Sequence, residues 1–143
     1  MSAAAGAVVL VGRVLFALYF GAVAAVAHIR QRQNFEGYAK AMGFPLVPLA
    51  GWPAGIWLAV GALSVALGVW PDVGVLMIAL FVVVAAFFFH AYWRLKDAQQ
   101  KMNQSFLFWR NIITLGASVA LFGLFASLGE ALRFTVTAPL FQF

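Results

Sequence analysis

The chain has 143 residues, of which 65% are hydrophobic and only 9% are charged, and its mean hydropathy is +0.98. A soluble domain carries roughly 25% charged residues, so this chain has too few polar side chains to cover a water-soluble globule, and we expect an integral membrane protein with a single domain over residues 1–143. The absence of cysteine excludes disulfides, thiol relays, covalent c-type haem and cysteine-ligated iron–sulfur clusters.

The net charge of +5 does not require a nucleic-acid partner. Anionic lipid headgroups attract basic residues at a membrane face, so we expect membrane lipids, and no nucleic acid, to be the partner of this charge. The first apolar stretch has no basic region before it and is long enough to span a bilayer. We therefore expect a retained helix and not a cleaved signal peptide.

Four apolar segments predict an all-α fold, an integral membrane bundle of four transmembrane helices. The segments cover residues 7–27, 52–70, 73–92 and 106–126, and each is close to the roughly 20 residues that cross a bilayer. Only a tight turn fits between the second and third segments, so these two form a hairpin. Pro71 suits a helix start there, because its missing N–H costs nothing at that position.

The connection over residues 28–51 is predicted to contain a short helix at about 34–42 that lies in the membrane interface. Apolar side chains recur there at helical spacing, at Phe35, Tyr38, Ala39 and Met42. Gly43 is expected to end this helix, and the prolines that follow prevent it from continuing. The other long connection, 94–105, is polar and basic, and we expect a loop.

Basic residues predict the orientation in the membrane. The two long connections lie on the same side, because two crossings separate them, and they contain Arg30, Arg32, Lys40, Arg94, Lys96 and Lys101. The opposite side contains only Arg133, together with Arg13 if that side chain extends outward. The positive-inside rule therefore places the long loops in the cytoplasm and both termini outside.

Small residues at helical spacing predict close helix packing in three of the spans, as is usual where helices meet in a membrane. They are Ala17, Gly21 and Ala25 in the first span, Gly51, Gly55, Gly61, Ser64 and Gly68 in the second, and Gly116, Ala120, Gly123 and Ser127 in the fourth.

Ionisable groups in or near a bilayer are costly, which makes them the first candidates for function. His28 closes the first predicted helix, His90 closes the third and Arg110 opens the fourth, so all three belong to one leaflet. Small residues precede both histidines at helical spacing, which predicts a pocket between helices, roofed by the short helix that carries Tyr38. We take His28, His90, Arg110 and Tyr38 as candidate ligand-binding residues.

Several ligands and one structural role fit these residues. An apolar pocket with a few polar groups suits a quinone, whose carbonyl oxygens would bond to histidine or arginine. Bis-histidine haem ligation would need two rings that face each other across a haem, and a metal would need carboxylate partners, so we expect neither. Alternatively, His28 and His90 are interface anchors like Tyr92 and Trp93.

Arg13 lies within the first span, where two arrangements are open. Its long side chain could extend to the outer interface, or it could pair with Asp72 in the turn on the same side. Elsewhere the sequence has no nucleophile with a base, no phosphate-binding glycine loop and no paired carboxylates. A free-standing enzyme is therefore not expected.

Short motifs extend over about residues 8–126. They are Gly12-Arg13-Val14-Leu15, His28-x-x-x-Arg32, Phe35-x-x-Tyr38-Ala39-x-x-Met42-Gly43-Phe44-Pro45, Gly61, Leu67-Gly68, His90 and Arg110-Asn111. Together they resemble the DoxX/DoxD-like family of small four-helix membrane proteins. Two positions depart from the family's pattern: Ile29 follows the first histidine where glycine is usual, and Arg32 stands where lysine is usual.

The resemblance implies a bacterial inner-membrane protein that is a subunit of a larger redox complex. Some members of the family resemble the small membrane subunit of thiosulfate:quinone oxidoreductase, and others are linked to membrane oxidoreductase complexes that handle oxidative stress. A quinone or lipid pocket near His28 and His90 would fit such a subunit. The alternative is a structural accessory or assembly subunit that packs against other transmembrane helices and has no ligand.

Overall fold

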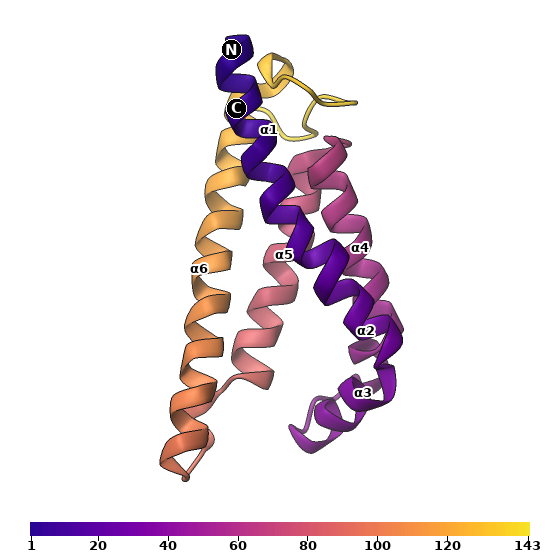
Figure 1. The fold of residues 1–143 in the computed structure, drawn as a ribbon, viewed down its shortest axis with the longest axis vertical. Helices are drawn as coiled ribbons and strands as arrows, with labels where there is room; N and C mark the ends of the chain where they lie inside the picture. The colour runs from indigo at the N-terminus through magenta and orange to yellow at the C-terminus, as the bar shows by residue number, and fades with distance from the viewer.

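All of residues 1–143 are described by a computed structural model, which is helical and contains no strand (Figure 1). Helix α1 (Ala3–Leu18) continues through a π-helical segment, η1 (Tyr19–Ala25), into α2 (Val26–Arg30). Helix α3 (Arg32–Ala41) and the 3₁₀ turn η2 (Val47–Ala50) lead to α4 (Trp52–Leu67). Helix α5 (Pro71–Val84) ends in a second π-helical segment, η3 (Ala85–Phe89), and is followed by the 3₁₀ turn η4 (Tyr92–Arg94), by α6 (Ala98–Leu128) and by the 3₁₀ turn η5 (Gly129–Ala131).

Three helical segments are long and apolar enough to cross a membrane: Ala3–Arg30, Pro71–Arg94 and Ala98–Ala131. Helix α4 is a shorter apolar helix. Large apolar side chains also cover the outer surface, where for example Val8 and Ile113 are each 73% exposed. Such a surface is suited to contact with lipid, so the chain is a helical membrane protein. The prediction of an all-helical fold built from apolar helices is confirmed.

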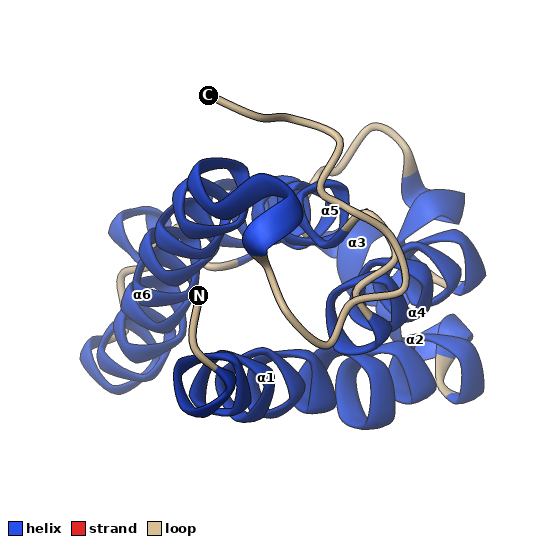
Figure 2. Ribbon diagram, turned by 90° about the horizontal axis from the view of Figure 1, so that it is seen from above, coloured by secondary structure: helices blue, strands red, loops and turns tan.

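Both chain termini lie at one end of the bundle, and α3 and the α5–α6 connection lie at the other (Figure 1). The two long connections therefore share an end, as the count of crossings predicts. Helix α1 packs against α4, α4 against α5, and α5 against α6. Seen along the bundle, the segment that follows α6 lies across the end of the helices (Figure 2).

The hairpin between α4 and α5 forms where the sequence predicts it. Helix α4 ends at Leu67, short of the predicted boundary at 70, because Gly68 adopts the left-handed conformation with φ 71°. Pro71 is the first residue of α5. The two helices then pack so closely that a Cβ added at Gly74 would lie 2.7 Å from the Gly61 carbonyl oxygen, so glycine is required at this crossing.

The predicted loop over 94–105 is wrong from residue 98 onward, because α6 begins at Ala98 and not at 106. The Asp97 side chain caps this helix by accepting the Gln100 backbone N–H at 2.8 Å. Gln99 also donates to the Asn103 side chain at 3.2 Å, one turn later. These first turns are polar but helical, and hydropathy alone does not distinguish a polar helix from a loop.

The small-residue stripes differ in whether they lie at a contact between helices. Those of the first and second predicted spans lie at helix contacts, where a Cβ added at Gly21 would lie 3.2 Å from the Ala62 Cβ. The prediction of close packing is wrong for α6. Gly116 and Gly123 have no atom within 4 Å of an added Cβ, and Ala120 and Ser127 are exposed. The stripe on α6 therefore faces out of the bundle.

Both arrangements expected for Arg13 are wrong. Arg13 and Asp72 are fully buried, and no hydrogen bond joins them, because Nε and Nη1 of Arg13 and Oδ1 of Asp72 have no partner. The guanidinium donates to the Phe134 carbonyl oxygen, and the carboxylate accepts the Phe141 backbone N–H at 2.7 Å. The C-terminal segment thus covers the end of the bundle and brings backbone partners to both charges.

Candidate functional site

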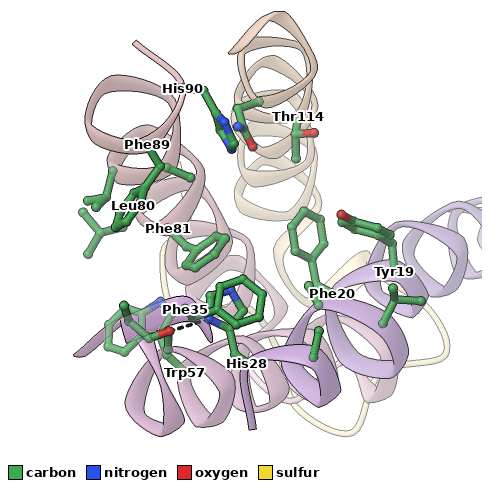
Figure 3. A pocket seen from close by; sticks show the side chains of 18 of the residues that line it. Tyr19, Phe20, His28, Phe35, Trp57, Leu80, Phe81, Phe89, His90 and Thr114 are labelled. Carbon is green, nitrogen blue, oxygen red and sulfur yellow. Dashed lines mark hydrogen bonds between the residues drawn. The ribbon is translucent and has the colours of Figure 1, made fainter. Parts of the chain in front are cut away.

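A cavity of about 890 Å³ lies among α1, α4, α5 and α6, on the side of the bundle where α3 is found. It is lined by 28 residues, of which 22 are hydrophobic, so its interior is suited to an apolar ligand. The four candidate residues predicted from the sequence, His28, Tyr38, His90 and Arg110, all line this cavity. Figure 3 shows the two histidines approaching it from different helices.

His28 is held by three neighbours. Its ring stacks on the Phe35 ring, with centroids 3.9 Å apart and planes at 22°, and it meets the edge of the Phe81 ring at 5.5 Å. Its Nδ1 lies 2.6 Å from the Ala50 carbonyl oxygen. The α3 helix is thus folded back over the end of α2, as the predicted roof requires, and the orientation of the His28 ring is fixed.

His90 lies one residue beyond the π-helical segment that ends α5. The helix stops there because His90 leaves helical geometry, with φ −119° and ψ 29°, while its backbone N–H donates to the Ala85 carbonyl oxygen. The side-chain Nδ1 lies 2.7 Å from Oε1 of Gln104, a residue of the unpredicted first turns of α6. That hydrogen bond holds the ring between α5 and α6.

Tyr38 connects α3 to the end of α5. Its hydroxyl donates to the Phe89 carbonyl oxygen at 2.8 Å, which is free because the helix ends at that residue. Burial raises the pKa of Tyr38 above its ordinary value of 10.0, and the Gln104 side chain partly offsets this rise. Tyr38 and Gln104 thus make separate hydrogen bonds at the edge of the cavity, one to the Phe89 carbonyl oxygen and one to His90.

Arg110 supplies a positive charge on the α6 side of the cavity. Its guanidinium carbon lies 6.0 Å from the centre of the ring of Tyr19, the first residue of η1. Cation–π attraction is favourable at this distance. Asn111 and Thr114 also line this part of the cavity, and no aspartate or glutamate is among the lining residues. The polar part of the cavity is thus positive and has no acidic counter-charge.

The cavity opens toward lipid between α1 and α6. These two helices are not among the pairs that pack closely, and Leu15 and Ile113, which line the cavity from the two sides, are 64% and 73% exposed. The Tyr19–Arg110 contact is the bridge across this opening. In Figure 3, Tyr19 and Thr114 lie on this side of the His28–Phe35 pair, and Trp57 and Leu80 lie on the other side.

Sequence reasoning missed the polar residues of α6. Gln104, Asn111 and Ser118 recur every seven residues on one face of α6, and Asn111 and Ser118 are buried. This spacing in an otherwise apolar helix is a signal that the sequence contains. A loop that extends to residue 105 hides this spacing, because it separates Gln104 from the helix that carries Asn111 and Ser118.

No cluster of three or more histidine, aspartate or glutamate side chains suited to a metal ion is present. No protein-family model, curated protein or solved structure matches the chain.

Proposed function

We propose that this chain is a DoxX-like protein of the bacterial inner membrane with four transmembrane spans, α4 being the fourth. With its 16 residues, α4 is about 24 Å long, slightly less than the hydrocarbon thickness of roughly 30 Å, and the 3₁₀ turn η2 precedes it. Helix α3 would lie in the interface with the long basic connections in the cytoplasm and the termini in the periplasm. Cysteine-scanning accessibility, made simple by the absence of native cysteine, tests this topology.

We further propose that the cavity binds a quinone or a similar ring-headed lipid, and that the chain serves as a quinone-linked subunit of a membrane redox complex. The observation that carries this proposal is the convergence of His28, Tyr38, His90 and Arg110 on one apolar cavity. The volume of about 890 Å³ lies within the range of roughly 300–1,000 Å³ of ligand sites. Aromatic walls suit the ring, and the polar groups suit its oxygens.

The test is direct binding in nanodiscs of phosphatidylethanolamine and phosphatidylglycerol. Trp57 lines the cavity, so decylubiquinone bound there should quench its fluorescence beyond the quenching seen in a Trp57→Phe variant. Thr114→Phe, which fills the polar part of the cavity, should weaken saturable binding at least ten-fold. Val119→Phe is the matched control, because Val119 is on the same helix, 60% exposed, and does not line the cavity. Binding that is non-saturable, or equal in both variants, rejects the pocket.

The outward stripe of α6 favours assembly with other transmembrane helices, either as part of the redox complex or as an accessory subunit without a ligand. Gly116 and Gly123 leave open space beside the backbone, which allows a neighbouring helix to approach closely. Gentle detergent extraction followed by mass spectrometry tests this: we expect other membrane proteins to copurify, and Gly116→Leu to reduce them. Migration only as a monomer or homo-oligomer contradicts the subunit proposal. A Soret band in the visible absorbance spectrum of the purified protein would indicate that the ligand is haem.

A further inference from the structure

The hydrogen bonds of the two histidines determine which ring nitrogens remain free. The partner of His28 Nδ1 is a backbone carbonyl oxygen, 2.6 Å away. A carbonyl oxygen can only accept, so Nδ1 carries the hydrogen. In the neutral ring, Nε2 then has a lone pair, and Nε2 makes no hydrogen bond within the protein.

The same assignment follows for His90 from its hydrogen bond to Gln104. The His90 Nδ1 atom lies 2.7 Å from Oε1 of the Gln104 amide. Because Oε1 can only accept, Nδ1 of His90 is the donor and Nε2 again has the lone pair.

The cavity thus contains two imidazole acceptors and one cationic donor, Arg110. A quinone oxygen is a carbonyl, which can accept from Arg110 but offers no hydrogen to Nε2. Two acceptors would then face each other in an apolar cavity, which costs free energy because neither is satisfied. A quinol hydroxyl can donate to Nε2 while its oxygen accepts from Arg110, so the reduced ligand satisfies both kinds of group.

We propose that the cavity is selective for the reduced, hydroxyl-bearing form of its ligand, a quinol, over the oxidised quinone. This inference rests on the proposed quinone-linked function. His28 and His90 are the residues that determine the preference. One net hydrogen bond of about 1 kcal/mol corresponds to about five-fold in affinity, so we expect about a five-fold preference for each histidine that contacts a hydroxyl.

The experiment compares three ligands that share the same tail and ring substituents and differ in the oxidation state of the ring and in whether the two oxygens carry hydrogen or methyl. Decylubiquinol, decylubiquinone and the dimethyl ether of decylubiquinol are equilibrated without oxygen with the full chain in the same nanodiscs, and the bound amount is measured by chromatography after subtraction of empty nanodiscs. The ether keeps both oxygens as acceptors but has no hydroxyl hydrogen. We expect quinol to bind about five-fold or more tightly than quinone, and the ether to bind like the quinone.

His28→Gln and His90→Gln identify the acceptor. Glutamine offers both a donor and an acceptor, so the variant at the contacting histidine should lose the preference while still binding. Ser127→Gln, on the exposed outer face of α6, should keep it.

Equal or tighter binding of quinone, or a preference that is undiminished in both histidine variants, overturns this inference and leaves the proposed pocket intact. Failure of all three ligands to bind overturns both. Because the ligand comparison needs no variant, misfolding of a substituted chain does not prevent the test.

Discussion

The contact between α4 and the end of the first span provides the sharpest test of the packing. A Cβ built at Gly55 would lie 2.6 Å from Cγ1 of Ile29, 2.9 Å from the Ala25 carbonyl oxygen and 3.3 Å from Cβ of His28. The Ile29 side chain can move, but the Ala25 oxygen belongs to the backbone of a helix. Gly55→Ala therefore requires the first span to shift away from α4 by several tenths of an ångström.

The expected magnitude follows from two opposing effects. Overpacking of this kind costs roughly 1–3 kcal/mol, and replacing glycine by alanine within a helix returns about 1 kcal/mol. We expect Gly55→Ala to lower the free energy of unfolding by about 1–2 kcal/mol. Gly116→Ala is the matched control, since nothing lies within 4 Å of its added Cβ, and it should be no less stable than the wild type.

The assay is unfolding in mixed micelles with increasing mole fraction of dodecyl sulfate, followed by circular dichroism. Ligand binding is measured on the same samples, because the shift also moves His28, and the affinity for decylubiquinol should fall in Gly55→Ala only. If the two alanine variants unfold at the same dodecyl sulfate fraction, the contact between α4 and the first span is not as close as described, and the reasoning is refuted.

Three further predictions concern the C-terminal segment, α3 and the opening of the cavity. Asp72→Leu should cost about 1–3 kcal/mol in the same unfolding assay, because the Phe141 N–H loses its acceptor, and Asp72→Asn should cost less; equal losses would contradict this. Burial raises the pKa of Tyr38 above 10.0, so the folded state favours the neutral phenol. The resulting contribution to the free energy of unfolding is complete below pH 10 and is lost as the pH rises through the folded-state pKa. Tyr38→Phe should lack that alkaline loss in pH-dependent unfolding, and an unchanged pH profile would be evidence against it. Ala117→Trp narrows the opening between α1 and α6 and should slow both association and dissociation of quinol in stopped-flow fluorescence, at least five-fold and with little change in affinity, whereas Ala120→Trp on the outer face of α6 should change neither rate.

Most of the candidate site followed from residue type and chain topology. The prediction groups His28, His90 and Arg110 because each stands at the end of a predicted span on one predicted side, and it adds Tyr38 because this residue lies on the predicted connecting helix. All four line one cavity. This prediction was possible because an ionisable residue is rare in apolar helices, so position along the chain already restricts depth in the bundle. The spacing of Gln104 marks a polar face of α6, but the pairing of His90 with Gln104 and of His28 with Ala50 was not predictable, because these hydrogen bonds join distant segments.

The sequence by itself determined the class of protein, because hydropathy and helix length follow from composition and local order. The start of α5 at Pro71 and the end of α4 before Gly68 are also determined locally, because each depends on backbone geometry that one residue type favours. Only the tertiary structure decided which small-residue stripes are buried and which carbonyl oxygen the Arg13 guanidinium contacts. Those outcomes depend on which helices are neighbours and on the C-terminal segment folding back over the bundle end, and periodicity within a helix contains no information about its neighbour.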